Sequence, residues 1–218
     1  MLYSANWKVE NGKLQETFIN TFSKPAFVIE TSANKKNKSI SEIGLIISDS
    51  PYDRKTLGDE GYILNVEKDK ITITASTPIG VFYGIQTLRQ LILLSCNQQD
   101  NKKTIKINCV TIRDKSKFEW RGVMLDPARY FLPIELLKKY INIMSLYKMN
   151  RLHLHLTDDL GWTVEMVKYP ELNRQENWPQ TPIYRNRGMY RRKEIQDLVA
   201  YAKERHITII PELELPGH

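Results

Sequence analysis

The stretch FEWRGVMLDPARYFLPIELLKKYINIMSLYKMNRLHLHLTDDLGWT, residues 118–163, decides the fold of this 218-residue chain. Residues 121–125 and 151–156 are short apolar runs typical of strands, and between them apolar side chains recur at helical spacing from Pro133 onward. A second helical pattern follows, and then another apolar strand in ITIIPELEL, residues 207–215. This alternation of strands and helices predicts an α/β fold with parallel strands joined by helical crossovers.

The helix that begins at Pro133 carries an unusually wide apolar surface. Two adjacent rows of side chains form it, with Ile134, Leu137, Ile141 and Met144 in one row and Leu136, Tyr140, Ile143 and Tyr147 in the other. A surface helix normally has a single narrower apolar stripe. We therefore expect this whole surface to be buried against a sheet.

Residues 1–115 have the pattern of a small α+β supporting domain, a sheet with one covering helix. Thr77 and Pro78 suit the start of that helix. We find no paired carboxylates, activated nucleophile or phosphate-binding loop in this half. The charged connector at 113–118 marks the boundary, which gives domains at 1–115 and 116–218. Strands are predicted at 27–30, 43–48, 61–67, 71–76 and 104–112, with a hairpin connection at 67–70 and a polar loop at 95–103.

Composition excludes several classes of protein. The net charge is +7, but the 32 basic residues are scattered among 25 acidic ones, which argues against a nucleic-acid partner. No apolar run approaches the roughly 20 residues of a membrane helix, so we expect no membrane partner. No signal peptide is visible at the N-terminus. The two cysteines, Cys96 and Cys109, lack zinc-type neighbours, and no cofactor or metal is expected.

Titratable residues gather at the end of the second predicted strand, in RLHLHLTDD at 151–159. Because side chains alternate along a strand, the leucines share one face and His153 and His155 share the other. Asp158 and Asp159 then lie at the C-terminal edge, where barrels of parallel strands place their active sites. The alternative is that both histidines are satisfied core residues.

Polar residues also follow the first and third predicted strands. Arg129 comes after the first, and its guanidinium offers a rigid set of donors suited to vicinal hydroxyls or carboxylates. It could instead form an ordinary surface salt bridge. Glu212, Glu214 and His218 come at the end of the third strand, within PELELPGH. We expect Arg129, Asp158 and His218 to converge at one edge of the sheet.

Four segments carry a specific resemblance to a known family. RGVMLDPARYF, KMNRLHLHLTDD followed by GW, YPEL and IPELELPGH occur in this order and resemble the retaining β-N-acetylhexosaminidases of glycoside hydrolase family 20. ITITASTPIGVFYGIQTLRQLI is similar to the α/β domain that precedes the barrel in those enzymes. The resemblance implies a (β/α)8 barrel, truncated in this sequence after its third strand.

The resemblance also implies roles for residues. Arg129 would bind the outer hydroxyls of the terminal sugar, and His155 and Glu214 would line the same substrate site. Asp158 and His218 would form a catalytic relay that supports the general acid. The general acid and its Asp partner would lie on a later strand, so these 218 residues are expected to be inactive alone. The family's usual Ser, His and Gln are Ala128, Tyr130 and Leu160 here, changes that we expect to tune the pocket.

The implied reaction removes terminal non-reducing β-linked N-acetylglucosamine or N-acetylgalactosamine by substrate-assisted retaining hydrolysis. Two other readings of the residues stay open. An H-x-H pair at a barrel strand end can bind zinc in a metal-dependent hydrolase, and the chain could be a non-catalytic carbohydrate-binding module. Family members commonly work in the periplasm, outside the cell or in degradative compartments. The natural glycan and the oligomeric state are not indicated by the sequence.

Overall fold

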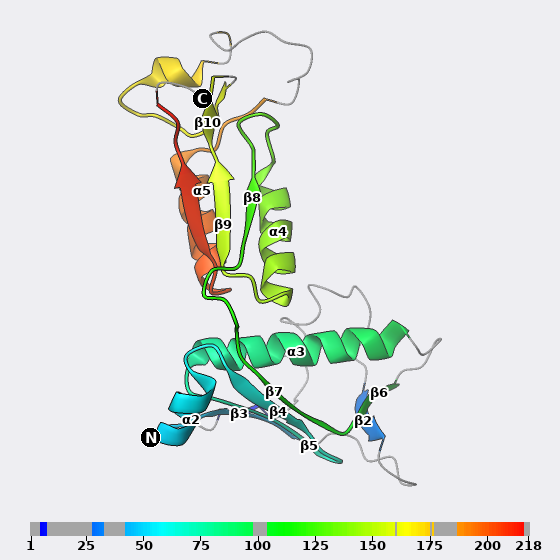
Figure 1. Cartoon of the computed structure of the whole chain (residues 1–218). Coiled ribbons are helices and arrows are strands. Elements are labelled where there is room, and N and C mark those ends of the chain that lie inside the picture. The colour runs from blue at the N-terminus through cyan, green and yellow to red at the C-terminus, as the bar shows by residue number, and fades with distance from the viewer. Residues whose placement is uncertain are drawn as a thin grey trace. The chain divides into compact units, whose positions relative to one another are not determined.

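The chain divides into two compact units, Met1–Lys117 and Phe118–His218, in a computed structural model. Figure 1 shows the elements of each unit. Within the described part of the chain, no helix is both long enough and apolar enough to cross a membrane. The structure describes residues 5–7, 28–32, 42–97, 104–159, 161–174, 176 and 187–215.

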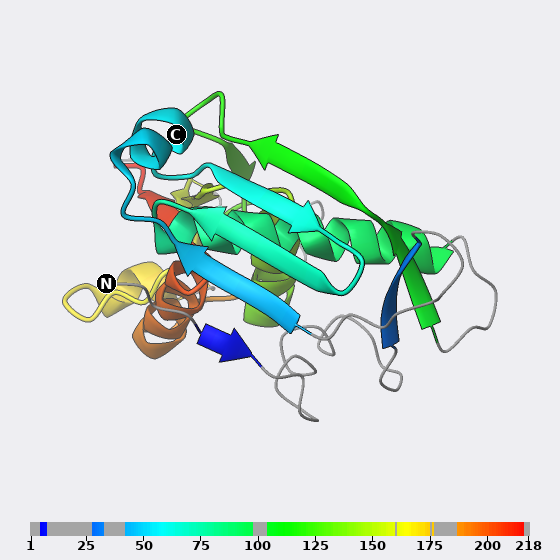
Figure 2. The same cartoon turned by 90° about the horizontal axis from the view of Figure 1, so that it is seen from below.

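The first unit is a mixed sheet covered on one face by a long helix, α3 (Pro78–Asn97) (Figure 2). Strands β3 and β5 run parallel, and β4 runs antiparallel to both β5 and β7. The backbone N–H of Glu67 donates to Lys70 O at 2.9 Å, which confirms the predicted hairpin. The sheet order is β1 (Ala5–Trp7), β3 (Glu42–Ile47), β5 (Lys70–Ala75), β4 (Tyr62–Val66) and β7 (Val110–Asp114).

The core of this unit follows from the alternation of its strands. Leu64, Ile71 and Ile73 are completely buried, and they pack with residues of α3 such as Ile92. Gly84 lets the helix approach closely, because a Cβ there would lie 2.4 Å from Ile73 Cγ2. The predicted sheet with a covering helix is therefore present, and it is held by an apolar layer between the two.

Three local predictions in the first unit were wrong. The strand expected at 104–112 is two strands, because the chain leaves one sheet for another at Cys109. β6 (Thr104–Asn108) pairs parallel with β2 (Val28–Ser32), whereas β7 pairs antiparallel with β4. Helix α3 continues to Asn97, into the expected polar loop. A short helix, α2 (Pro51–Leu57), was not anticipated.

The second unit is a parallel sheet in the order β12-β9-β8, with both of its α-helices on one face (Figure 1). The predicted parallel pairing is confirmed. A two-stranded hairpin and a short 3-10 helix follow β9. The elements are β8 (Gly122–Leu125), α4 (Ile134–Leu146), β9 (Arg151–His155), β10 (Thr157–Asp158), β11 (Gly161–Trp162), η1 (Pro170–Asn173), α5 (Arg192–Lys203) and β12 (Thr208–Glu212).

Asn150 fixes where β9 begins. Its side-chain amide donates to Glu119 O at 2.8 Å, and its side-chain oxygen accepts from the Arg121 N–H at 3.0 Å. Its own backbone N–H donates to Arg121 O at 2.8 Å. This residue is 4 % exposed, so these hydrogen bonds replace water that it has lost. As a result, Leu152 and Leu154 face the helices and are completely buried.

The wide apolar surface of α4 is only half buried, which corrects the prediction. Leu137, Ile141 and Met144 lie in the core with 0–2 % exposure, as expected. The second row stays on the surface of the described structure, because one helix can turn only one stripe toward a sheet. Its members are Leu136, Tyr140, Ile143 and Tyr147, which are 37 %, 36 %, 55 % and 65 % exposed.

Candidate active site

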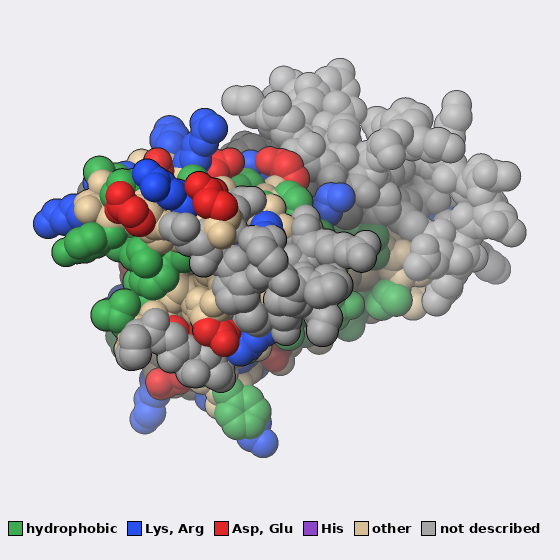
Figure 3. All heavy atoms as spheres, turned by 90° about the horizontal axis from the view of Figure 1, so that it is seen from above, with side chains coloured by type: hydrophobic (Ala, Val, Ile, Leu, Met, Phe, Trp, Pro, Cys, Tyr) green, Lys and Arg blue, Asp and Glu red, His purple; other side chains and the backbone are tan. Residues whose placement is uncertain are grey.

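The carboxyl ends of the three parallel strands bring charged side chains to one edge of the sheet. Two backbone hydrogen bonds tie the strand ends together: Ala128 N–H donates to His155 O, and Leu156 N–H donates to Glu212 O. Glu212 is the register partner of His155, so the two residues are adjacent across the β9–β12 pair. Seen from above, acidic and basic side chains lie close together on this unit (Figure 3).

Arg129 lies between two carboxylates. Its Nη1 is 2.7 Å from Asp126 Oδ2, and its Nη2 is 2.7 Å from Asp158 Oδ2. Asp126 also accepts the backbone N–H of Arg129 at 3.1 Å, which shapes the turn after β8. The Arg129 side chain is 35 % exposed, whereas that of Asp158 is fully buried. The structure thus brings together two of the residues singled out by sequence, and it leaves part of the guanidinium accessible.

Asp158 is stabilised as a carboxylate in a buried position. Burial is the largest influence and raises its pKa, but hydrogen bonds with Asp159 and His155 and the charge of Arg129 outweigh it. The net effect lowers the pKa of Asp158 to about 2. Its Oδ1 accepts the Asp159 N–H at 2.7 Å, and its Oδ2 is 2.9 Å from His155 Nε2. Asp158 is therefore ionised at neutral pH, without direct contact with bulk water.

His155 is 2 % exposed, and both of its ring nitrogens face carboxylates. Nε2 faces Asp158, and Nδ1 is 2.9 Å from Glu212 Oε2. Burial is the largest influence on its pKa and lowers it, but the contacts with Asp158 and Glu212 together raise the pKa above its ordinary value. Both ring nitrogens of His155 thus face protein carboxylates, and its contact with a substrate stays a prediction.

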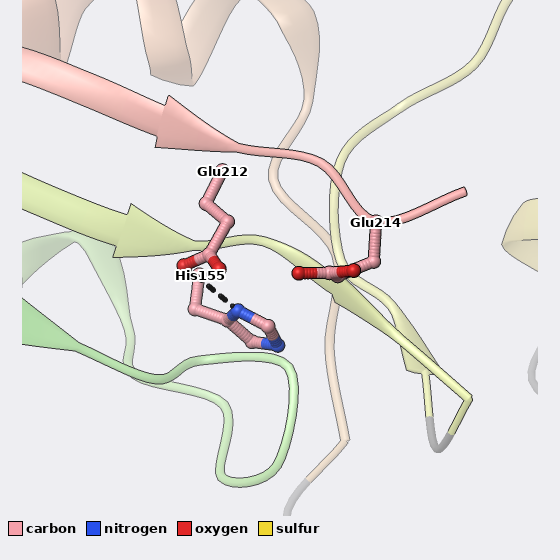
Figure 4. A group of neighbouring side chains, drawn as sticks. All are labelled: His155, Glu212 and Glu214. Atoms are coloured by element: carbon pink, nitrogen blue, oxygen red, sulfur yellow. Dashed lines mark ion pairs between the residues drawn. The ribbon is translucent and has the colours of Figure 1, made fainter. Parts of the chain in front are cut away.

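Glu212 joins the two histidines of the H-x-H motif. Its Oε2 is 2.9 Å from His155 Nδ1 and 2.7 Å from His153 Nε2. The short contact with His155 is the main cause that lowers the pKa of Glu212. Figure 4 shows that Glu212 and Glu214 both approach His155 from the β12 segment. Glu214 is placed by its backbone N–H, which donates to Thr157 Oγ1 at 2.7 Å.

His155, Glu212 and Glu214 bring possible metal-ligand atoms within 4.8 Å of one another. A metal ion requires a ring nitrogen with a free lone pair. Both nitrogens of His155 lie at hydrogen-bonding distance from carboxylate oxygens, where protons are the natural occupants. The Arg129 guanidinium, 2.7 Å from Asp158, adds positive charge to the same cluster. The donor set therefore fits a proton network better than a metal centre.

Two family models match the chain. Residues 118–218 match the model of the catalytic domain of glycosyl hydrolase family 20, and residues 8–115 match the model of domain 2 of the same family. The chain belongs to glycosyl hydrolase family 20. The two matched ranges together cover nearly all of the chain.

Curated relatives of this family 20 chain include two bacterial proteins named beta-hexosaminidase. The one from Porphyromonas gingivalis is 39 % identical over 165 residues, which are 74 % of this chain and 21 % of that protein. The one from Akkermansia muciniphila is 36 % identical over 210 residues, 91 % of this chain and 41 % of that protein. The chain thus spans about a fifth to two fifths of the length of these relatives.

Solved structures of family 20 resemble the fold. A GH20 beta-N-acetylhexosaminidase from Streptomyces coelicolor superposes with a TM-score of 0.70 at 35 % identity, and the match covers 81 % of this chain and 35 % of that one. A mutant Streptomyces plicatus beta-hexosaminidase in complex with product GlcNAc gives a TM-score of 0.71 at 30 % identity, covering 97 % of this chain and 42 % of that one. These neighbours support an α/β fold with an N-terminal domain.

His218 and Leu160 lie outside the residues that the structure describes. The contact between Asp158 and His218, and with it the convergence of Arg129, Asp158 and His218, therefore stays a prediction. Glu214 is described, and it lies on the same edge as Asp158, linked to that segment through Thr157.

Sequence patterns assigned no chemical role to Asp126 and Glu212, and they assigned to His153 only that of a possible zinc ligand. The contacts of Glu212 with the two histidines depend on which residues of neighbouring strands lie opposite each other, and no local pattern reports that. The pair of Asp126 and Arg129 is local, since the two residues are three positions apart. One signal was nevertheless available. His155 and Glu212 each come near the end of an apolar strand, and aligning those ends places them side by side.

Proposed function

We propose that the protein carrying this chain is a β-N-acetylhexosaminidase that removes terminal non-reducing β-linked N-acetylglucosamine or N-acetylgalactosamine from glycans. The observation that carries the proposal is the placement of Arg129 between Asp126 and Asp158, at 2.7 Å from each, with part of the guanidinium exposed. A guanidinium fixed by two carboxylates presents its accessible face in one orientation, as the recognition of paired sugar hydroxyls requires.

The same proposal assigns β8, β9 and β12 to the first three strands of a (β/α)8 barrel. Their parallel order, with α4 and α5 as crossovers on one face, supports the assignment. In such barrels the catalytic groups lie at the carboxyl ends of the strands. Asp126, Arg129, Asp158 and Glu212 all lie at that end. The 218 residues would then contain three of the barrel's eight strands.

In the proposed reaction, the substrate supplies its own nucleophile. The carbonyl oxygen of the 2-acetamido group attacks the anomeric carbon, the glycosidic C–O bond breaks, and the leaving oxygen takes a proton from a general acid. Water then opens the cyclic intermediate with retention of configuration. The general acid and the Asp that orients the acetamido group are expected outside the described residues. Arg129 would hold the outer hydroxyls, Glu214 would line the site, and Asp158 with His218 would support the acid.

The test is hydrolysis of 4-nitrophenyl N-acetyl-β-glucosaminide by the full-length gene product. We expect release of nitrophenol. We expect Arg129→Lys to reduce kcat/KM by about a hundred-fold, because the lysine ammonium group cannot reproduce the fixed, planar set of donors of the guanidinium. Arg192→Lys, on the exposed start of α5, is the matched control and should leave kcat/KM unchanged.

Two outcomes would contradict the proposal. Binding of N-acetylglucosamine without turnover would indicate a carbohydrate-binding module. Equal activity of Arg129→Lys and Arg192→Lys would remove Arg129 from the site.

A further inference from the structure

Carboxylates alternate with guanidinium and imidazole groups across all three strand ends. The order is Asp126, Arg129, Asp158, His155 and Glu212, with His153 at the far end, and each neighbouring pair is separated by 2.7 or 2.9 Å. The Arg129 side chain is 35 % exposed, and it would contact the sugar according to the proposed function. The buried His155 ring lies behind it and is connected to it through Asp158.

The His155 ring can satisfy both of its neighbours in one protonation state. A neutral imidazole has one donor nitrogen and one acceptor nitrogen. With carboxylate oxygens 2.9 Å from Nε2 and 2.9 Å from Nδ1, a neutral ring would direct a lone pair at one of these oxygens. The imidazolium donates from both nitrogens and removes that repulsion. The geometry therefore favours the charged ring.

The positive charge of a protonated His155 would stabilise Glu212 Oε2. This oxygen is buried, although the Glu212 side chain as a whole is 31 % exposed. It lies 2.9 Å from His155 Nδ1 and 2.7 Å from His153 Nε2. A buried carboxylate oxygen is costly unless a donor or a cation is adjacent, and a protonated His155 supplies both. His155 is the more deeply buried of the two rings, at 2 % exposure against 37 % for His153.

We propose that Glu212 is a positioning residue of this active site, which bridges the two histidines of the H-x-H motif and keeps His155 as an imidazolium, so that Asp158 stays aligned on Arg129. The proposal rests on the proposed function for its effect on turnover. Glu212 is not a catalytic residue, since it acts through His155 and Asp158. The other charged groups around His155 are Asp126 and Arg129 from the loop after β8 and Glu214 after β12.

The first measurement is the titration of His155 by NMR on histidine-labelled protein. The chain has four histidines, so His155 can be assigned by substitution. We expect the midpoint of the wild-type ring to lie above its ordinary value of 6.5. Glu212→Gln, which keeps the shape and removes the charge, should lower the midpoint by about one pH unit. A wild-type midpoint below 6.5, or no shift in Glu212→Gln, would overturn the proposal.

The second measurement is the pH profile of kcat/KM in the full-length protein. Glu212→Gln should lose activity at a lower pH than the wild type, and it should recover activity as the pH is lowered below the midpoint of its own His155 titration. A purely structural role predicts equal loss at every pH, and that result would refute the idea. The control is Glu135→Gln, an exposed α4 residue paired with Lys138, which should reproduce the wild-type profile.

A third variant keeps the proposal testable if Glu212→Gln does not fold. His153→Gln removes only the outer, half-exposed ring, which leaves Glu212 more strongly committed to His155. The midpoint of His155 should then rise or stay unchanged, and a fall would contradict the proposal. The NMR titration does not depend on turnover. An inactive protein with the expected titration would refute only the proposed function, whereas an active protein without it would refute only the role of Glu212.

Discussion

The two units bury polar side chains of different kinds. In the first unit, the Tyr62 hydroxyl lies 2.5 Å from Thr87 Oγ1 and donates to Asp114 Oδ2 at 2.9 Å, between a strand, the covering helix and the neighbouring strand. In the second unit, the buried groups are Asp158 and His155, and they continue to the partly exposed Arg129. Hydroxyls satisfy burial with modest bonds, whereas full charges need a partner at every contact. The first arrangement contributes to the stability of its unit, and the second fixes the orientation of the charged side chains at the sheet edge.

Removal of the Asp158 charge should have the largest effect on stability and on activity. Asp158→Asn leaves His155 and Arg129 without their shared carboxylate. We expect a loss of about 2–3 kcal/mol in the free energy of unfolding, less than for a fully buried pair because Arg129 is 35 % exposed. We also expect kcat/KM of the full-length protein to fall by about a hundred-fold or more. Urea denaturation and initial rates measure the two effects.

Asp197→Asn is the matched control, since its pair with Lys193 is exposed on α5. It should change stability by less than about 0.5 kcal/mol. If both Asn variants lose the same stability, the contrast between buried and exposed charge in this unit does not hold.

Removal of a buried hydroxyl from the first unit should lower the free energy of unfolding by less than Asp158→Asn does, and it should not change kcat/KM. Tyr62→Phe removes the hydroxyl that Thr87 and Asp114 share, and we expect a loss of about 1–2 kcal/mol because the Thr87 side chain stays buried. Tyr52→Phe, at a residue that is 66 % exposed, serves as the control. Equilibrium unfolding gives the stability, and an altered kcat/KM in Tyr62→Phe would show that the two networks are coupled.

The stability of the charged network around Asp158 and His155 should depend on pH. The pKa of Asp158 is lowered in the fold, so its stabilisation is present above its ordinary value of 3.8 and is lost as pH falls toward about 2. The pKa of His155 is raised, so its stabilisation is complete below 6.5 and is lost as pH rises through the higher folded value. The second unit should thus be most stable between about pH 4 and 6.5. Hydrogen exchange of β9 amides as a function of pH measures this, and a stability that rises from pH 6.5 to 8 would contradict it.

Chelation should have the smallest effect. Because both His155 nitrogens face carboxylates, we expect prolonged dialysis against EDTA to leave kcat/KM of the full-length protein unchanged. A loss of activity that zinc restores would favour a metal-dependent hydrolase and would assign the cluster of His155, Glu212 and Glu214 to metal binding.

The sequence predicted the orientation of side chains best where a single periodicity, such as the alternation along a strand, determines it. The alternation in β9 separates Leu152 and Leu154 from His153 and His155, and the structure keeps that separation. The pattern was less informative for α4, because hydrophobicity identifies side chains that can be buried and does not say which neighbours exist to bury them. Tyr147 is apolar enough for a core, yet it is 65 % exposed.

Other features depend on contacts that no local window contains. The break at Cys109 separates two strands that pair with different sheets, and the local sequence does not say which sheet each strand joins. The contact between His155 and Glu212 joins residues 57 positions apart, and it follows only from the register of β9 against β12. Arg129 and Asp158 could be singled out beforehand because strand ends mark the active edge of parallel sheets. Their 2.7 Å contact could not be foreseen.

Asn150 has a consequence for the way this protein can change over evolutionary time. By anchoring the first residue of β9, it decides which side chains of the strand turn toward leucine-rich packing and which turn toward the charged edge. A one-residue shift of β9 against this anchor would exchange the two sets, turning the imidazoles toward the apolar core and the leucines toward the charged edge. We therefore expect few substitutions of Asn150 to preserve the fold. Substitutions on the outer faces of the helices can instead accumulate without disturbing either set.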